Sequence, residues 1–262
     1  MPEGHTIHRV AQDHRQRYLG EPLAVSSPQG RFTDGASQLD GKTLCAVDAH
    51  GKHLFYEWQD NLLLHIHLGL YGKFRNHRTP PPEPRGAVRM RVISNQHAFD
   101  LNGPTACELI SPTQYAALRA RLGADPLRKD ADVEAAWSRI HRSRSAIGKL
   151  LLDQSVIAGV GNVYRAEALF VNRLSPQRPG NELSRKEFDQ LWKTLVEMLR
   201  VGVKYNRIIT ADPKDVGKPA SRMNRDERLL CYKKECCVHC DREISVWDLG
   251  ARTMYACLSC QQ

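Results

Sequence analysis

Long apolar runs are what this sequence most clearly lacks. No stretch of the 262 residues approaches the roughly 18 consecutive apolar residues that a membrane span needs. The N-terminus has no apolar segment typical of a secretory signal, and no internal repeat is visible. We therefore expect a soluble intracellular protein, located in the cytoplasm. A hydrophobic fraction of 41% is enough for one large domain or two ordinary ones.

Cysteine is scarce over most of the chain. Only Cys45 and Cys107 occur in the first half, whereas six cysteines crowd between Cys231 and Cys260. Evenly spread cysteines in a small secreted chain would indicate disulfides, but a terminal cluster in a chain without a signal indicates metal binding.

The terminal cysteines have the spacing of a zinc site. Cys237 and Cys240 form one C-x2-C pair, Cys257 and Cys260 form another, and the 16 residues 241–256 separate them. Each pair lets two thiolates face one ion, and two pairs complete a tetrahedron. Four cysteine ligands leave no open position, so we expect one structural zinc ion, with residues 241–256 forming a β-hairpin. Free or disulfide-bonded cysteines are the alternative.

The first ligand pair has competing choices nearby. Cys236 adjoins Cys237, and His239 lies between the ligands, so a Cys236–His239 or a Cys236–Cys240 pair is also open. The repeated two-residue spacing favours Cys237 and Cys240.

The charge balance is strongly basic. The formal net charge is +9 and the isoelectric point is about 9.2. An excess of Lys and Arg suggests a polyanionic partner, most often a nucleic acid, although many basic proteins bind none.

The periodicity of apolar residues changes along the chain. Residues 6–18 have helical spacing, and residues 22–110 contain short strand-like runs separated by Gly, Pro, Asp and Asn. A proline-rich loop, HRTPPPEPRG, interrupts these runs. Helical periodicity follows a boundary at RLGADPLRKDAD, and a helix should reach about Asp153. Residues 206–228 are polar and indicate a mobile loop.

These patterns predict an α+β multidomain fold. We expect a catalytic β-sandwich domain with a leading helix at 1–124, a linker at 125–136, a helical domain at 137–228 and a zinc finger at 229–262.

A glycine-containing turn is the second strong motif. In QSVIAGVGNVYRAEALF, Gly159 and Gly161 form a compact turn, and a helix begins near Asn162. Glycines allow close backbone approach to a phosphate, a helix N-terminus offers free N–H donors, and Asn162 adds a neutral donor. Upstream basic residues could complete a phosphate clamp: Arg139, Arg142, Arg144 and Lys149. An ordinary helix–turn–helix in a core explains the turn equally well.

Four motifs in register resemble one family. The N-terminal PEG, GKHLF, QSVIAGVGNVYRAEALF and the terminal C-x2-C-x16-C-x2-C together resemble the formamidopyrimidine-DNA glycosylase/endonuclease VIII family along essentially the whole chain. The resemblance implies a β-sandwich followed by a helix–two-turn–helix domain and a zinc finger. It also implies a bifunctional DNA glycosylase/AP lyase of base excision repair, acting on damaged double-stranded DNA as a monomer associated with the nucleoid.

The resemblance gives the N-terminus a chemical role. After removal of Met1, Pro2 would carry a free secondary amine, and an α-amino group has a pKa of about 7.7–8.0, so part of it is neutral. The positive end of the following helix should lower that pKa further. Attack on the sugar C1′ would give an iminium, an electron sink that allows strand cleavage by β,δ-elimination. Glu3 would shuttle protons. Alone, Pro-Glu would be read as a helix entry.

The resemblance also assigns DNA contacts. Lys52 matches a lysine that contacts DNA phosphate and assists catalysis, and Asn162 and Arg252 match phosphate-binding residues. Leu70 and Tyr71 match a wedge that fills the gap left by a flipped-out nucleotide. A solvated lysine and a buried strand-end pair are the plainer explanations of Lys52 and of the wedge.

The wedge indicates the branch of the family. A Leu70–Tyr71 pair resembles endonuclease VIII, and HAFDLNGPTACEL has no Arg-x-Phe of the purine-repair branch, so we favour oxidised pyrimidines over oxidised purines. Thr6 stands where many members have a second glutamate, and Gly69 stands where the wedge commonly has Gln. The smaller wedge predicts tolerance of single-stranded DNA. A non-catalytic binder of damaged DNA through the zinc finger is the remaining alternative.

Overall fold

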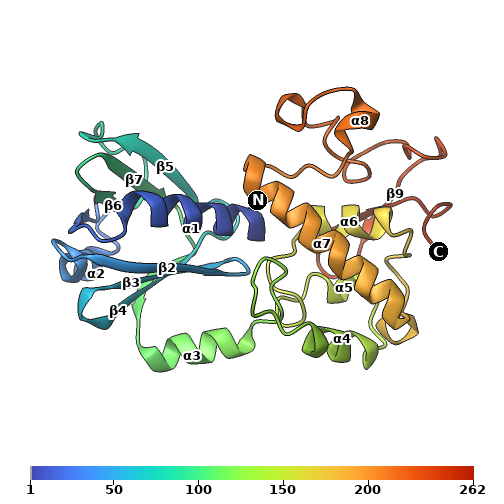
Figure 1. The fold of residues 1–262 in the computed structure, drawn as a ribbon, viewed down its shortest axis with the longest axis horizontal. Coiled ribbons are helices and arrows are strands. Elements are labelled where there is room, and N and C mark those ends of the chain that lie inside the picture. The colour runs from blue at the N-terminus through green and yellow to red at the C-terminus, as the bar shows by residue number, and fades with distance from the viewer. Residues whose placement is uncertain (1) are drawn as a thin grey trace. The chain divides into compact units, whose positions relative to one another are not determined.

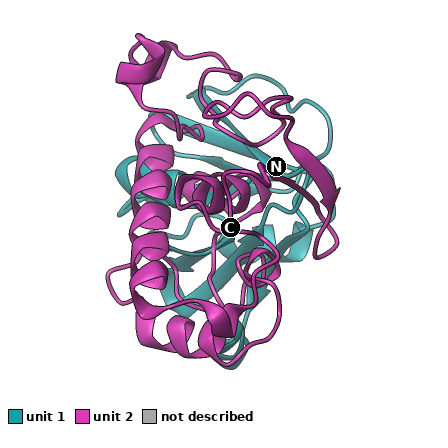
Figure 2. Ribbon diagram, turned by 90° about the vertical axis from the view of Figure 1, so that its right-hand side faces the viewer, with its two compact units in different colours: residues 1–2, 7–121 teal, residues 3–6, 122–262 magenta. Residues whose placement is uncertain are grey.

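The computed structural model describes residues 2–262, and Met1, whose removal the sequence predicts, lies outside them. The described chain divides into two compact units, residues 7–121 with Pro2 and residues 122–262 with Glu3–Thr6 (Figure 2). Each unit has its own hydrophobic core. In residues 2–262 no helix is long and apolar enough to cross a membrane.

The first part of the chain is rich in strands (Figure 1). Its elements up to residue 121 are α1 (Gly4–Tyr18), β1 (Ala24–Ser26), α2 (Thr33–Leu39), β2 (Leu44–His50), β3 (His53–Trp58), a 3-10 turn (Gln59–Asn61), β4 (Leu62–His67), β5 (Lys73–Arg78), β6 (Val88–Ile93), β7 (His97–Asn102), β8 (Ala106–Ile110) and α3 (Pro112–Arg121).

The strands form two antiparallel four-stranded sheets, in the orders β1-β6-β7-β5 and β2-β3-β4-β8. Side chains of both sheets share one buried core, as the alternation of Leu54, Tyr56 and Trp58 on β3 illustrates. The fold of this unit is therefore a β-sandwich, as the sequence predicts.

Two helices cover this sandwich in different ways. Along α1 the residues Ile7, Ala11 and Tyr18 are buried in the sandwich core, which explains their helical spacing. Helix α3 lies on the outer face of the second sheet, where the Tyr115 ring packs edge-on against Phe55 at 4.9 Å between centroids.

The second part of the chain is mainly helical (Figure 1). Its elements are α4 (Val133–His141), α5 (Ile147–Leu150), α6 (Asn162–Val171), a 3-10 turn (Gly180–Glu182), α7 (Arg185–Tyr205), α8 (Pro213–Val216), a 3-10 turn (Ala220–Arg222), β9 (Ser245–Asp248) and β10 (Thr253–Ala256). Helix α7 begins with a capping box, in which Ser184 and Glu187 bond each other's backbone. Strands β9 and β10 form the predicted hairpin.

Two local expectations are wrong. The range 22–110 contains the helix α2, which tertiary packing stabilises because Ala36 and Leu39 are buried. The helix expected to reach Asp153 ends at Leu150, because Asp153 accepts bonds from the backbone and hydroxyl of Ser155 and forms a turn.

The polar segment 206–228 is more structured than its composition predicts. It contains α8 and a 3-10 turn, and it has a small apolar cluster of its own, formed by Ile209, Ala220 and Met223. Sequence periodicity misses this cluster because its members are too far apart along the chain to form a pattern.

Candidate functional site

Glu3 lies at the N-terminus of α6. Its Oε2 accepts a hydrogen bond from the Gly161 amide at 2.9 Å, and its Oε1 accepts one from the Val163 amide at 3.0 Å. The Glu3 side chain is fully buried. Because the carboxylate is shielded from solvent, its negative charge is stabilised by the positive end of the helix dipole and by these two N–H donors.

The glycines of the turn make room for the N-terminal segment. A Cβ on Gly161 would lie 2.3 Å from Cδ of Glu3, and a Cβ on Gly4 would lie 2.9 Å from Cα of Gly159. The Gly4 amide also donates to the Gly159 carbonyl at 2.8 Å. The sequence predicts close approach of this turn to a phosphate, whereas in the structure the group that approaches Gly161 is Glu3.

Pro2 precedes this anchor directly. It is half-buried and stands two residues before the first residue of α1, Gly4. Because Glu3 is fixed by α6, the backbone at Pro2 is held at one end. The structure therefore places the expected proton shuttle and the expected nucleophile next to each other.

Asn162 is engaged with the zinc hairpin. Its Nδ2 donates to the Thr253 carbonyl at 2.8 Å, and its Oδ1 accepts from Arg165 at 2.5 Å. The residue is buried. The sequence predicts a phosphate donor here, and the structure shows the side chain joining α6 to β10, with one amide hydrogen left for another acceptor.

Arg165 is a residue that sequence reasoning missed. Its guanidinium is fully buried and donates to the carbonyls of Leu249 at 2.8 Å and Gly148 at 3.2 Å. Burial lowers the pKa of Arg165 to about 10, although the charge of Glu3 opposes that shift. This arginine fixes the turn of the hairpin that carries Arg252.

Glu167 is the second residue that was missed. Its buried carboxylate accepts bonds from the amides of Leu230, Cys231 and Tyr232 at 2.7–2.8 Å, and from the Thr210 hydroxyl. Both Arg165 and Glu167 are charged residues within the mainly apolar segment NVYRAEALFV. Because the helix α6 that this segment forms is buried on nearly all sides, its charged residues need partners inside the protein.

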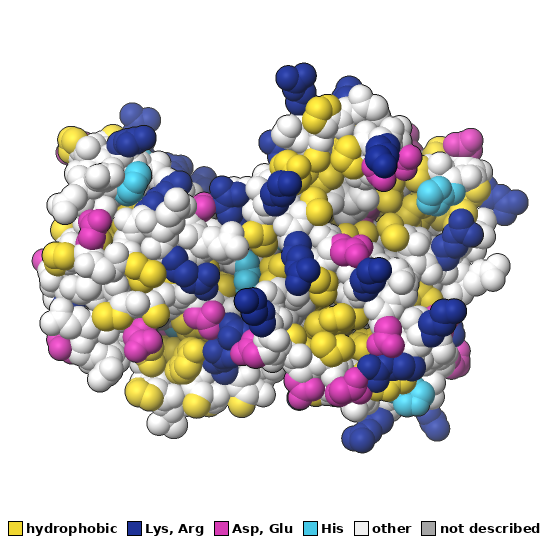
Figure 3. Space-filling model, in the orientation of Figure 1, with side chains coloured by type: hydrophobic (Ala, Val, Ile, Leu, Met, Phe, Trp, Pro, Cys, Tyr) yellow, Lys and Arg dark blue, Asp and Glu magenta, His cyan; other side chains and the backbone are white. Residues whose placement is uncertain are grey.

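Arg252 lies in the turn between β9 and β10 and is exposed. The Leu249 amide donates to the Arg252 carbonyl at 3.0 Å, which closes this turn. The upstream basic side chains of Arg139, Arg142, Arg144 and Lys149 are exposed on the same unit. Lys and Arg side chains are spread over the face in Figure 3, mixed with acidic ones rather than gathered in one stripe.

Lys52 is in a two-residue turn between β2 and β3. The turn is closed by the pair His50 and His53, and Gly51 has a φ of 59°, which favours glycine at that position. Lys52 itself is half-buried. The hairpin therefore fixes the backbone from which the lysine extends.

The predicted wedge residues are exposed at the end of a strand. Tyr71 is 86% exposed and Leu70 is 46% exposed, in the turn between β4 and β5. Gly69 has a φ of 64°, and a Cβ there would lie 1.9 Å from Oγ1 of Thr105. A side chain at 69 would strain the backbone and displace Thr105, so the exposed side chains of the predicted wedge are those of Leu70 and Tyr71.

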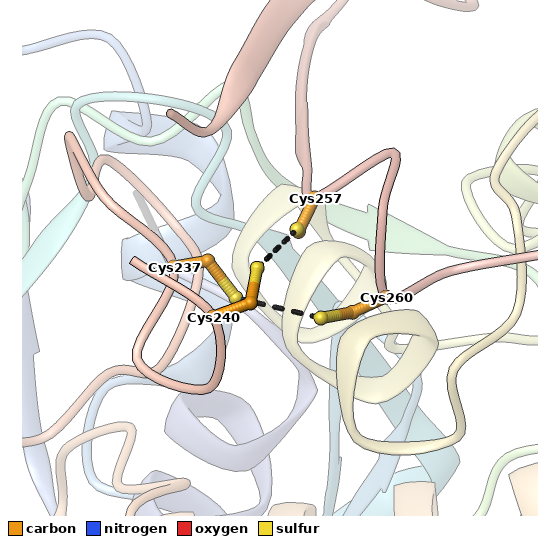
Figure 4. Close-up of side chains that lie close together, drawn as sticks. All are labelled: Cys237, Cys240, Cys257 and Cys260. Carbon is orange, nitrogen blue, oxygen red and sulfur yellow. Dashed lines mark hydrogen bonds between the residues drawn. The ribbon is translucent and has the colours of Figure 1, made fainter. Parts of the chain in front are cut away.

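The four cysteines predicted to bind zinc converge (Figure 4). Their sulfur atoms all lie within 4.8 Å of one another, with Cys237 and Cys260 at 3.9 Å and Cys240 and Cys257 at 3.5 Å. Zn–S bonds of about 2.3 Å in a tetrahedron place sulfurs at such separations, so the four thiols fit a metal ion.

The competing ligands of the first pair lie outside this cluster. Cys236 is exposed, and the His239 ring stacks on Phe170 at 5.1 Å between centroids. In residues 2–262 the four cysteines are the only group with metal-ligand spacing. The four cysteines that could hold a metal ion therefore include Cys237 and Cys240 and exclude Cys236 and His239.

The sandwich, the glycine turn that binds Glu3 and the four-cysteine hairpin define the class of helix–two-turn–helix DNA glycosylases. The family model of the formamidopyrimidine-DNA glycosylase N-terminal domain matches residues 1–104, and that of the formamidopyrimidine-DNA glycosylase H2TH domain matches residues 122–213.

Whole-chain comparisons agree. Endonuclease 8 1 of Mycobacterium tuberculosis is 47% identical over 268 residues and covers all of both chains. The formamidopyrimidine-DNA glycosylase of Lactococcus lactis subsp. lactis is 25% identical, again over both full chains. A crystal structure of the Lactococcus lactis Fpg with abasic-site DNA has a TM-score of 0.82 at 23% identity and covers 99% of each chain. The chain belongs to the formamidopyrimidine-DNA glycosylase/endonuclease VIII family of DNA glycosylases and AP lyases.

Proposed function

We propose that this protein is a base-excision-repair enzyme that removes oxidised pyrimidines from damaged double-stranded DNA and then cuts the strand. The observation that carries the proposal is the fixed pair at the N-terminus, in which Glu3 is held by the amides of Gly161 and Val163 next to Pro2. A protein that only binds DNA has no use for such a pair.

The reaction begins at the Pro2 nitrogen. After removal of Met1, the neutral amine attacks C1′, a bond from nitrogen to C1′ forms, and the bond from C1′ to the base breaks. The departing base takes a proton from water, and the proton on the nitrogen passes to Glu3. Opening of the sugar gives an iminium, which makes the C2′ proton acidic. Loss of that proton expels the 3′ phosphate, and a second elimination expels the 5′ phosphate.

Glu3 is the proton shuttle of this scheme. Each of its oxygens accepts one backbone bond. A carboxylate oxygen has two lone pairs, so a carboxylate held in this way can take a proton and return it to the sugar. Lys52 would bind phosphate at the reaction centre, and Asn162 and Arg252 would bind the phosphates that position the duplex.

The wedge supports pyrimidines as the substrate class. Leu70 and Tyr71 are exposed side by side and could fill the gap left by a flipped-out nucleotide. The mycobacterial relative named Endonuclease 8 1 favours the same branch. The Fpg relatives keep oxidised purines as the alternative, and a non-catalytic binder of damaged DNA is the second alternative.

One zinc ion is the proposed occupant of the four-cysteine site. Cys237, Cys240, Cys257 and Cys260 would complete its coordination, so the ion would stabilise the hairpin and take no part in the reaction. We also propose that the protein acts as a monomer in the cytoplasm.

Borohydride reduction tests the nucleophile. Incubation with abasic or thymine-glycol DNA should give a covalent complex, and Pro2→Gly or a retained Met1 should abolish it. A complex that persists in both, formed through an internal lysine, would show that the terminal amine is not the nucleophile. Absence of any complex with the unaltered protein would favour the non-catalytic alternative.

Excision rates decide the substrate class. Thymine glycol should be released faster than 8-oxoguanine paired with cytosine under single-turnover conditions. The reverse order would assign the protein to purine repair while leaving the lyase chemistry intact.

A further inference from the structure

Three side chains form a hydrogen-bonded row across the outer face of the second sheet. Nδ1 of His53 on β3 lies 2.9 Å from Nε2 of His65 on β4, and Nδ1 of His65 lies 3.1 Å from Oε1 of Glu108 on β8. His65 and Glu108 are direct register partners on neighbouring strands. The row therefore joins three strands side by side.

The end of the row fixes the position of every proton in it. A carboxylate can only accept, so Nδ1 of His65 donates to Glu108. A neutral imidazole has one donor and one acceptor, which leaves Nε2 of His65 as an acceptor. Nδ1 of His53 must then donate to it, and Nε2 of His53 keeps a free lone pair.

Both rings are kept neutral by their surroundings. Burial, together with the charges of His67, His65, His50 and Arg121, lowers the pKa of His53 to about 3. Burial also lowers the pKa of His65, although the bond to Glu108 opposes this. The charged groups named here come from the elements around the rings, β2, β4, β8 and α3. Because the pKa values of both rings are lowered, neither ring holds an extra proton near neutral pH.

The two ends of the row are in different environments. His53 directly follows Lys52, and its ring lies 4.8 Å from the His67 ring. Burial lowers the pKa of His67, and the charges of His65 and Lys52 contribute to the same shift, so Lys52 acts on this end of the row. At the other end the Glu108 side chain is 58% exposed, whereas that of His65 is 5% exposed. A hydrogen-bonded path thus leads from the half-buried His53, next to Lys52, through the buried His65 to the exposed Glu108.

We propose that Glu108, His65 and His53 form a proton relay that connects the Lys52 side of the reaction centre with solvent. It rests on the proposed catalytic role of Lys52. The relay lets Lys52 exchange protons while bound DNA covers it.

The transfer conserves protons at every atom. A proton arriving from the Lys52 side binds Nε2 of His53, and the proton on Nδ1 of His53 moves to Nε2 of His65. The proton on Nδ1 of His65 moves to Glu108, which releases it to water. Return of both rings to their first tautomer resets the row.

A metal site is a poorer explanation of these histidines. In residues 2–262, metal-ligand spacing is found only in the four-cysteine cluster. The nitrogen of His65 that faces Glu108 is also the opposite one from the nitrogen that faces His53, so the three groups point along a line rather than at one centre.

Glu108→Gln separates a relay from a structural brace. Glutamine still accepts the bond from His65 but cannot take up a proton, so it keeps the brace and breaks the relay. We expect single-turnover cleavage of preformed abasic DNA at low buffer concentration to slow by about tenfold or more. Added imidazole should restore the rate, because a diffusing base replaces the lost acceptor. Glu57→Gln, an exposed carboxylate on the same sheet, is the matched control and should match the unaltered protein.

The outcomes are distinct. A Glu108→Gln rate equal to that of the Glu57→Gln control would overturn the relay, as would a slow rate that imidazole leaves unchanged. A nitrogen NMR spectrum of the free protein checks the tautomers, and protonated Nε2 on His65 would contradict the row. Failure of the proposed function gives a different result, since the unaltered protein and the control would then also fail to cleave.

Discussion

The carboxylate of Glu3 and the amide of Gly161 are 158 positions apart in the chain and 2.9 Å apart in the structure. Any side chain at 161 would have to displace Glu3, because a Cβ there would lie 2.3 Å from the carboxyl carbon of Glu3. The glycine turn thus sets the position of the residue that follows the proposed nucleophile, and two motifs at opposite ends of the sequence depend on each other.

Gly161→Ala should separate folding from catalysis. The added methyl group displaces Glu3, and overpacking of this kind costs about 1–3 kcal/mol. We expect a lower unfolding midpoint in urea and a loss of borohydride trapping larger than the change in DNA affinity. Gly217→Ala is the control: a Cβ there has open space, but a φ of 69° strains the backbone, so the variant should lose stability while keeping borohydride trapping. Unchanged trapping in Gly161→Ala would mean that the position of Glu3 is unimportant.

Arg252→Ala should reduce the salt dependence of DNA binding. If Arg252 binds one phosphate, its removal lowers the slope of log affinity against log salt by about 1. The measurement is a fluorescence anisotropy titration at several salt concentrations. Arg242→Ala is the matched control, because Arg242 lies on the same module and bonds Ser259 at 2.7 Å. Equal slopes for the two variants would remove Arg252 from the phosphate contacts.

Cys257→Ser should release the metal. The four sulfur atoms converge within 4.8 Å, so loss of one ligand breaks the tetrahedron. We expect metal analysis to fall from about one zinc per chain to near zero, together with weaker DNA binding. Cys236→Ser should keep the metal, since Cys236 is exposed outside the cluster. Loss of the metal in Cys236→Ser would assign the first ligand pair to Cys236, and an unchanged metal content in Cys257→Ser would mean that the ligands are a different set.

Tyr71→Ala should weaken lesion processing without loosening the fold. The ring is 86% exposed, so its removal leaves the core intact. Unstacking a base costs a few kcal/mol, and a wedge offsets part of this free energy by filling the gap in the base stack. Without the Tyr71 ring, flipping the nucleotide out of the duplex should be less favourable. We expect slower base excision from duplex DNA and a smaller effect on single-stranded DNA. Equal slowing on both substrates would argue against a wedge.

Motifs with fixed spacing could be predicted from the sequence. The cysteine pairs need only local turns to converge, so Cys237, Cys240, Cys257 and Cys260 follow from their intervals. The strands follow from alternation, as on β3. In both cases the physical cause acts within a short stretch, which a single sequence displays.

Residues whose role depends on distant partners could not be predicted. Arg165 and Glu167 look like ordinary polar positions of a helix, and their function comes from carbonyls and amides more than 60 residues away. The partner of Gly161 was missed for the same reason. The histidine row crosses three strands, and only the register of the sheet aligns His53, His65 and Glu108.

Acidification should destabilise the protein through its buried histidines. Burial lowers the pKa of His14 from 6.5 to about 3, and its Nδ1 lies 2.7 Å from the Tyr56 hydroxyl. The unfolded chain binds a proton between those two values and the folded chain does not. The stability that neutral His14 provides is therefore present above pH 6.5 and is lost as the pH falls toward 3. Each such histidine lowers the free energy of unfolding by up to about 1.4 kcal/mol per pH unit in this window.

Urea unfolding between pH 7 and 5.5 measures this slope. His14→Phe removes the titrating group while keeping a ring that can stack on Phe99, now 4.4 Å from the His14 ring. We expect the variant to be less stable at pH 7, because it leaves the Tyr56 hydroxyl without its partner, and to have a shallower dependence on pH. A slope identical to that of the unaltered protein would mean that His14 does not resist protonation. The narrow range of pH keeps most carboxylates ionised, so the difference in slope reports on the histidine alone.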